Sequence, residues 1–136
     1  MSDLHRLRPA VRAALALATA FAAAGASAQT VITNSGFTAT AADVHDIYVG
    51  DKQYAGSTRV VAVDNASAQK AFLEHVLKLE PGKYNSIWAK KSFREGLNAP
   101  LTKSTDSEVV DFVKKTPGAI GYIGDASKAV GVNVVK

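Results

Sequence analysis

The sequence predicts an α/β domain whose mainly parallel sheet is flanked by helices. Two short apolar runs, residues 60–63 and 119–123, are typical of strands that are covered on both faces. The segments between them contain apolar residues that recur at helical spacing. Strands that alternate with helices are joined by crossovers, which favours a layered fold with parallel strands.

The first predicted elements are a strand, a helix and a loop. Residues 31–32 begin a short strand. Thr40 and Asp43 form a capping box, which predicts a helix that ends near Gly50. Residues 51–58 are polar and contain a glycine, so we expect a loop there.

The run at residues 60–63 leads into a second helix. Asp64 is expected to end the strand, and Ser67 is placed to cap the helix that follows. The apolar stripe of this helix contains Ala68, Phe72, Val76 and Leu79. Pro81 cannot continue the helix and ends it. The remaining elements are expected to be a helix at 83–94, a loop at 98–103, a helix that runs from a capping box of Thr105 and Glu108 to residue 115, and strands at 119–123 and 130–135.

Residues 1–28 have the pattern of a secretory signal peptide. Arg6, Arg8 and Arg12 precede an apolar stretch that is too short to span a membrane, and Ala-Ser-Ala at 26–28 fits a cleavage site. An amphipathic helix of the folded domain is the alternative, but the alanine-rich run has no polar face. We therefore expect one folded domain at residues 29–136, located in a bacterial periplasm, with no membrane-spanning segment after cleavage.

Composition excludes several classes of function. The sequence contains no Cys, so disulfides, thiolate metal ligands and Cys nucleophiles are excluded. Of the 16 Lys and Arg and the 12 Asp and Glu, three Arg and one Asp lie in residues 1–28, so residues 29–136 keep 13 and 11, a net charge of +2. That small charge, with no basic stripe, gives no reason to expect nucleic-acid binding.

No constellation in the sequence indicates catalysis or a cofactor. His45 and His75 are isolated from other ligands at metal-binding spacing. Ser67 does not lie in a G-x-S-x-G elbow, and the sequence has no G-x-x-x-x-G-K loop. We therefore expect a protein that is not an enzyme and that has no metal or cofactor.

Helix starts are the remaining candidates for a binding site. The helix starts are Thr40, Ser67 and residues 104–107. If parallel strands lead into these helices, two or three of the starts open on one edge of the sheet, where their N–H groups and hydroxyls suit an oxyanion. The alternative is ordinary capping, which Ser and Thr perform in any protein. Trp88, Tyr84 and Phe93 present a similar choice between a stacking platform and the core, and their helical spacing favours the core.

Several of these segments together resemble a known family. The helix and loop at residues 43–51, the strand at 60–64 and the W-x-x-x-x-F-x-G stretch at 88–96 are similar to segments of phosphate-binding periplasmic proteins. The most specific similarity is at residues 104–123, which end in P-G-A-I-G-Y-I. The resemblance covers residues 31–124 and identifies the phosphate ABC transporter substrate-binding proteins, which have the type II periplasmic-binding fold.

The resemblance implies one lobe of a two-lobed binding protein. It also implies phosphate or a similar oxyanion as ligand, and a membrane permease or a sensor protein as partner. At the place of the family's R-S-D-G-S-G-T loop this chain reads Asp-Asn-Ala-Ser-Ala-Gln at 64–69, so the Arg and both Gly have no counterpart. Ser67 matches the Ser of that motif, and the ligand-binding residues we predict are Ser67, Ala68, Gln69 and Thr105. The alternative hypothesis is a lobe that has lost its small ligand and docks a protein partner.

Overall fold

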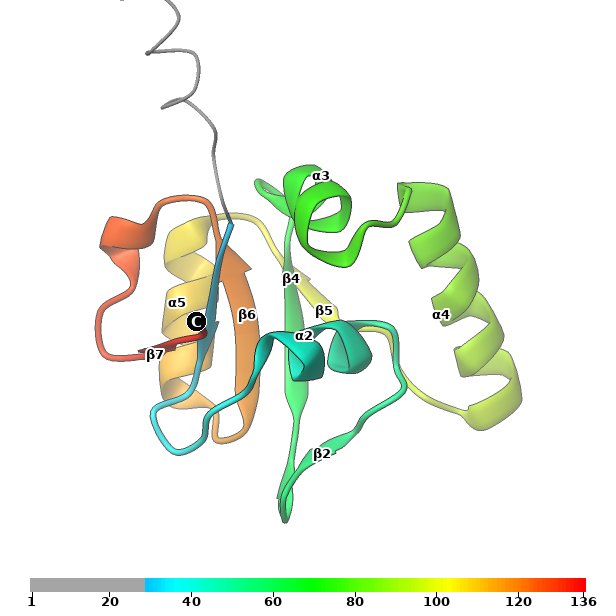
Figure 1. The fold of residues 1–136 in the computed structure, drawn as a ribbon, viewed down its shortest axis with the longest axis horizontal. Helices are drawn as coiled ribbons and strands as arrows, with labels where there is room; N and C mark the ends of the chain where they lie inside the picture. The colour runs from blue at the N-terminus through cyan, green and yellow to red at the C-terminus, as the bar shows by residue number, and fades with distance from the viewer. Residues whose placement is uncertain (1–28) are drawn as a thin grey trace, which may run out of the picture.

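The computed structural model describes residues 29–136. Within them, a five-stranded sheet is covered by helices, and a two-stranded hairpin extends from one end (Figure 1). The elements are, in chain order, β1 (Thr30–Thr33), α2 (Ala41–Tyr48), β2 (Tyr54–Ala55), β3 (Thr58–Arg59), β4 (Val61–Asn65), α3 (Gln69–Phe72), the π-helical turn η2 (Leu73–Leu77), α4 (Pro81–Glu95), β5 (Leu101–Lys103), α5 (Asp106–Lys115), β6 (Ala119–Ile123), the 3-10 turn η3 (Ala126–Lys128) and β7 (Asn133–Val134).

The sheet is mainly parallel, as the sequence predicts. Its strand order is β5-β4-β6-β1-β7. β4 runs parallel to both β5 and β6, whereas β1 runs antiparallel to β6 and to β7. β1 is therefore the strand that points the other way, and the carboxyl ends of β4, β5 and β6 lie on the same edge.

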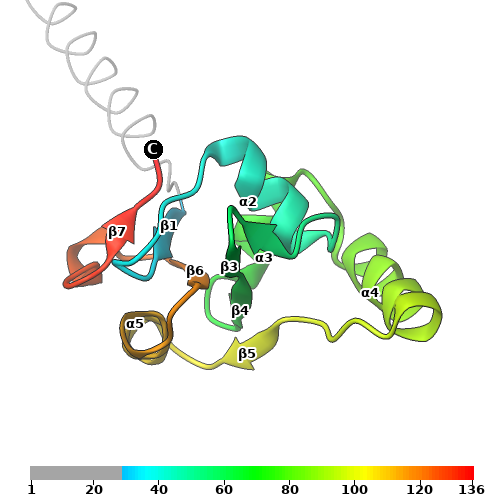
Figure 2. The same cartoon turned by 90° about the horizontal axis from the view of Figure 1, so that it is seen from below.

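Both faces of the sheet are buried, and β6 contributes to both cores. Ile120 and Tyr122 pack into a cluster with residues of α2, α3 and α4, whereas Ala119 and Ile123 pack with α5. Figure 2 shows α2 and α5 on opposite sides of this strand. Because successive side chains of a strand point to opposite faces, a strand buried on both sides reads as the continuous apolar run seen in the sequence.

A glycine allows α5 to lie close to the centre of the sheet. A Cβ at Gly121 would lie 2.7 Å from Val109 Cγ1 and 2.9 Å from Val63 Cγ1. Both distances are shorter than a van der Waals contact between two carbon atoms. A side chain at this position would therefore push α5 away from β6. The apolar pattern predicted the strand, and the packing explains its glycine.

Two expected loops contain short strands. β2 and β3 form a hairpin within and just after residues 51–58, and Gly56 adopts a left-handed φ of 63° in its turn. β5 lies within residues 98–103, pairs with β4 at the edge of the sheet and leaves Leu101 and Thr102 exposed. Strands of two or three residues held mainly by backbone pairing have no hydrophobic period for sequence analysis to detect.

Two predictions around the second strand were wrong: the residue at which the strand ends, and the residue that caps the next helix. β4 continues through Asp64 to Asn65, because the interior satisfies both polar side chains with hydrogen bonds. Ser67 does not cap the helix, which begins at Gln69 after the cap residue Ala68. The Ser67 hydroxyl instead donates to Asn65 Oδ1 at 2.6 Å.

Most other predicted elements are confirmed. The Thr40–Asp43 capping box is present in both directions, and Thr105 accepts from Glu108 N–H, although the Glu108 carboxylate accepts from Ser104 N–H rather than from Thr105.

Pro81 was expected to end the second helix, but that helix already ends at Leu77, before Lys78 at a left-handed φ of 58°. Pro81 instead begins α4 two residues before the expected start, because proline fits the first position of a helix.

The predicted aromatic core is only partly confirmed. Tyr84 and Trp88 are buried, but Phe93 is 89% exposed. Phe93 lies five residues beyond Trp88, which places it about 140° around the helix from the buried face.

The predicted signal peptide, residues 1–28, lies outside the described residues. Within residues 29–136, no helix combines the length and the apolar character needed to cross a membrane.

Candidate functional site

The carboxyl edge of the parallel strands brings three segments together. β4, β5 and β6 end at Asn65, Lys103 and Ile123, and the chain that follows each strand lies on this edge, beside α3 at the top of Figure 1. The segments that follow are residues 66–69, 104–106 and 124–125. In open α/β sheets, ligands bind outside the carboxyl ends of the strands, so this edge is the candidate site.

Asn65 joins the segments at the edge. Its side chain is fully buried. Its Oδ1 accepts hydrogen bonds from Ser67 N at 3.0 Å and from Ser67 Oγ at 2.6 Å, forming an Asx turn. Its Nδ2 donates to Asp106 Oδ1 at 2.7 Å and to the Tyr122 carbonyl at 3.0 Å. Asn65 therefore fixes the loop after β4 to the start of α5 and to β6.

The Asp106 carboxylate occupies a cluster of donors at this edge. In addition to the Asn65 amide, Gly124 N–H donates to Oδ1 at 3.1 Å and Asp125 N–H donates to Oδ2 at 3.0 Å. Partial burial raises the pKa of Asp106, but the hydrogen bonds from Gly124, Asn65 and Asp125 outweigh it and hold that pKa below its ordinary value. The edge thus holds an anion that belongs to the chain itself.

The four predicted ligand-binding residues lie on this edge, but they differ in exposure and in the hydrogen bonds they already make. Ser67 and Thr105 are exposed, and Gln69 is half-buried in the first turn of α3. Ala68 is buried, and its N–H donates to the Asn65 carbonyl at 3.0 Å. The Thr105 side chain accepts from Glu108 N at 3.2 Å. Ser67 and Thr105 are connected through Asn65 and Asp106, which the sequence did not single out as site residues.

Thr40, the third predicted helix start, does not join the site. Thr40 follows β1, and β1 runs opposite to the other strands of the sheet. The start of α2 therefore lies towards the other edge, away from Ser67. Its capping box with Asp43 has the structural role expected of such a sequence.

A buried carboxyl group lies one residue before Asn65. Asp64 is 3% exposed and accepts hydrogen bonds from the hydroxyls of Tyr84 at 2.8 Å and Tyr122 at 2.6 Å. Burial raises the pKa of Asp64, opposed by the bonds from Tyr122 and Tyr84. Burial and the neighbouring Asp64 also raise the pKa values of both tyrosines well above the ordinary range. This cluster fixes α4 to the sheet beneath the candidate site.

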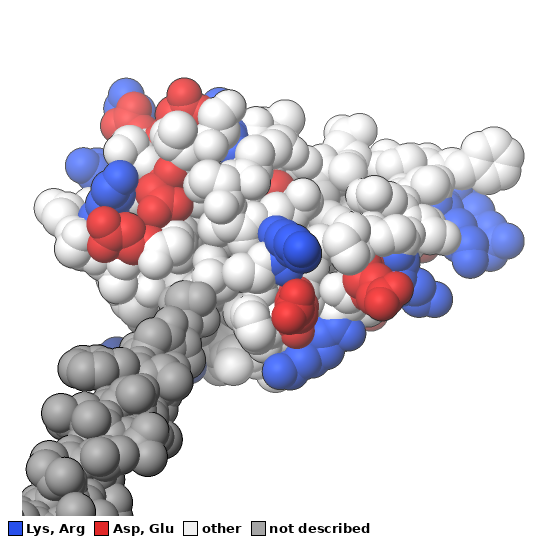
Figure 3. Space-filling model, turned by 90° about the horizontal axis from the view of Figure 1, so that it is seen from above, with Lys and Arg blue, Asp and Glu red and all other residues white. Residues whose placement is uncertain are grey.

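Charges of both signs are interspersed on the face seen from this edge. Figure 3 shows Lys and Arg side chains beside Asp and Glu on the described part of the surface, without a continuous basic patch. Within residues 29–136, no three His, Cys, Asp or Glu side chains are grouped so that they could hold a metal ion. The chemistry available at the edge is hydrogen bonding by hydroxyl, amide and backbone N–H groups.

Comparisons with known proteins support the fold. No protein-family model and no curated protein sequence matches the chain. An ABC-type phosphate transport receptor from Vibrio cholerae is similar in structure, with a TM-score of 0.58 and 14% identity over 81% of this chain and 46% of the receptor. PstS from Borrelia burgdorferi is similar with a TM-score of 0.58 and 20% identity over 81% of this chain and 47% of PstS.

The chain has the fold of one lobe of a periplasmic binding protein. The resemblance read from the sequence is confirmed at this level. The chain spans less than half of the length of each of the two receptors.

Proposed function

We propose that the protein is an exported, non-catalytic binding protein that takes phosphate or a similar oxyanion at the carboxyl edge of β4 and β5. The observation that carries this proposal is that Ser67, Thr105 and the first turn of α3 all lie at the carboxyl edge of the parallel strands β4 and β5, where ligands of open α/β sheets bind. Hydroxyl and N–H donors at this edge favour negative oxygen atoms, because hydrogen bonds to charged acceptors are the strongest. The Asn65 amide and the N–H groups of Gly124 and Asp125 hold the Asp106 carboxylate beside them, so Asp106 lies next to the proposed ligand.

The ligand contacts proposed beside Asp106 are the hydroxyls of Ser67 and Thr105 and the N–H groups of Ala68 and Gln69. Gln69 N–H is in the first turn of α3 and has no acceptor within the helix. On binding, the Ser67 hydroxyl gives up its hydrogen bond to Asn65 Oδ1 and donates to the anion. The Ala68 N–H gives up its hydrogen bond to the Asn65 carbonyl and also donates to the anion.

Asp106 then determines which oxyanion is accepted. A carboxylate repels an anion that has no proton, but it accepts a hydrogen bond from a protonated one. Phosphate carries a proton at neutral pH, whereas sulfate does not. The site therefore prefers phosphate to sulfate.

Calorimetric titration of the purified protein with phosphate tests this assignment. Loss of one donor to a charged ligand is expected to weaken binding roughly tenfold in Ser67→Ala. Ser107→Ala is the matched control, since Ser107 is exposed on α5 and is not among the proposed contacts. Equal phosphate affinity in the wild type and Ser67→Ala would show that the site is placed wrongly.

A second candidate function is a module that docks a protein partner, such as a permease or a sensor, without a small ligand. One observation favours it: the chain's own Asp106 accepts the hydrogen bonds of the Asn65 amide and of the Gly124 and Asp125 N–H groups at the candidate site. Analytical ultracentrifugation over a concentration series tests the self-docking form, which requires a mass that rises with concentration.

A further inference from the structure

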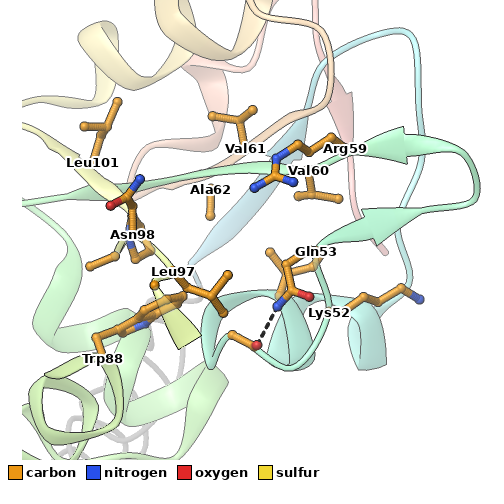
Figure 4. A pocket seen from close by; sticks show the side chains of 15 residues that line it. Lys52, Gln53, Arg59, Val60, Val61, Ala62, Trp88, Leu97, Asn98 and Leu101 are labelled. Atoms are coloured by element: carbon orange, nitrogen blue, oxygen red, sulfur yellow. Dashed lines mark hydrogen bonds between the residues drawn. The ribbon is translucent and has the colours of Figure 1, made fainter. Parts of the chain in front are cut away.

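A cavity of about 610 Å³ opens at the other end of the sheet from Ser67 and Thr105. It lies at the amino ends of β4 and β5, where Val61 and Leu101 line it. The end of α2, the strand β3, helix α4 and the chain at 96–100 form the other walls (Figure 4). This volume is within the range of small-molecule sites, roughly 300–1,000 Å³.

The short edge strand explains why the cavity exists. β5 pairs with β4 only from Val63 onward, while Val61 and Ala62 pair with β6 on their other side. The chain at 96–100 has no strand pairing before β5 begins. The amino half of β4 therefore has no neighbouring strand on this side, and space remains between the sheet and α4.

A fixed aromatic side chain forms one wall. Trp88 Nε1 donates to the Tyr48 carbonyl at 2.9 Å, which holds the indole in place. Gly50 lies against the indole at a φ of 82°, and a Cβ there would be 3.0 Å from the ring carbon Cη2 of Trp88. The glycine lets the turn after α2 approach the indole, so this wall is preformed.

The charged residues that line the cavity are both cations. Lys52 is paired with Asp43 at 2.8 Å, and this contact is the main cause that lowers the pKa of Asp43 to about 2. Arg59 contacts Tyr54, with its guanidinium carbon 5.7 Å from the ring centroid, and among residues 29–136 it has no ion pair with a carboxylate. Figure 4 shows the guanidinium of Arg59, the last residue of β3, extending along the cavity near Val60 and Val61. No Asp or Glu among the described residues lines the cavity.

We propose that this cavity binds a small monoanion with an apolar body, such as a carboxylate on a short hydrocarbon chain. The carboxylate pairs with Arg59, which can hold it with two hydrogen bonds. The hydrocarbon lies against Ala62, Leu97 and Trp88. Inorganic phosphate has no apolar part to bury there, so this site is independent of the one at the opposite edge.

Titration of the full protein with octanoate, with 1-octanol as the uncharged match, tests the proposal. Trp88 is the single Trp of the sequence, so its fluorescence and its indole NMR resonance report on the cavity directly. Octanoate is expected to bind about tenfold more tightly than 1-octanol because of the pair with Arg59. Saturating phosphate should leave octanoate affinity unchanged, which separates this site from the proposed phosphate site.

Three variants and a control identify the contacts. Arg59→Gln should abolish the preference for octanoate over 1-octanol, and Ala62→Leu should weaken both ligands by filling the cavity. Lys115→Gln removes an exposed cation on α5 and should leave both affinities unchanged. Asn98→Asp, on the exposed loop that lines the cavity, should weaken octanoate alone and does not disturb the core.

The proposal is overturned by any of three results. The first is equal affinity for octanoate and 1-octanol, the second is an unchanged preference in Arg59→Gln, and the third is binding that leaves the Trp88 resonance in place.

Discussion

Asn65 Nδ2 donates a hydrogen bond to Asp106 Oδ1 at 2.7 Å and so joins the end of β4 to the start of α5. The two residues are separated by 41 positions in the chain. Asn65 is fully buried and also bonds Ser67 and the Tyr122 carbonyl. The proposed anion site and the stability of this edge therefore depend on the same side chain.

Asn65→Ala should lower the free energy of unfolding by about 2–3 kcal/mol, because it leaves buried partners without their hydrogen bonds. Urea denaturation measures the change. Asn98→Ala, on an exposed loop, is the control and should stay within about 0.5 kcal/mol of the wild type. Equal effects in the two variants would contradict the central place given to Asn65.

Gly121→Ala should destabilise the protein by about 1–3 kcal/mol, since the new methyl group meets Val109 and Val63 at distances too short for contact. Gly82→Ala is the matched control. Gly82 is in the first turn of α4, and a methyl group added there would have no neighbouring atom within 4 Å, so alanine should be neutral or stabilising. Thermal unfolding of both variants gives the comparison, and a harmless Gly121→Ala would mean that α5 does not lie this close to β6.

The buried carboxyl of Asp64 should make stability fall with rising pH. Burial raises its pKa above the ordinary 3.8, so between the unfolded and folded pKa values the folded protein binds more protons than the unfolded chain. The free energy of unfolding therefore decreases as the pH rises through that window. Asp64→Asn lacks this loss, so its stability relative to the wild type should increase with pH in urea denaturation.

Asp106 should have the opposite effect on the pH dependence of stability. Its folded pKa lies below 3.8, so its stabilising contribution is present above the unfolded pKa and disappears as the pH falls through the folded pKa. Asp106→Asn should therefore lose stability relative to the wild type as the pH rises from the acid range. The same slope in Asp64→Asn and Asp106→Asn would contradict the environments described for the two carboxyl groups.

Asp106→Asn should also change anion selectivity. The substitution removes the charge that repels sulfate, and it replaces one acceptor oxygen of the carboxylate by an NH2 group, which cannot accept the phosphate proton. Calorimetry should therefore show sulfate binding more tightly, and the ratio of phosphate to sulfate affinity falling. Asp111→Asn, which changes an exposed carboxylate on the same helix, is the control. An unchanged ratio in Asp106→Asn would remove Asp106 from the proposed site.

The sequence predicted the parts of the fold that carry a hydrophobic period. The runs that became β4 and β6 are apolar because both faces are buried, and the capping box at Thr40 marks the start of α2 correctly. β5 was missed because an exposed edge strand is held mainly by backbone pairing and has no such period. The resemblance, which is most specific in residues 104–123, added the kind of α/β fold, one lobe of a periplasmic binding protein.

The candidate site was predicted only in outline. Parallel strands followed by polar turns indicated the correct edge, but the assignment of Ser67 as a helix cap overlooked Asn65 two residues earlier. Asn and Ser at this spacing also form an Asx turn, which was the available signal. The bond between Asn65 and Asp106 depends on the pairing of β4 with β5, which local sequence patterns do not predict.

Thermal unfolding of the purified protein with phosphate, compared with sulfate, tests the central claim most directly. A ligand at about 100 times its dissociation constant stabilises the folded state by about 2.7 kcal/mol, which corresponds to a shift of roughly 10 °C for a domain of this size. Binding at the edge held by Asn65 and Asp106 predicts that shift with phosphate and a much smaller one with sulfate. An unchanged melting temperature up to millimolar phosphate, or equal shifts with both anions, would contradict it.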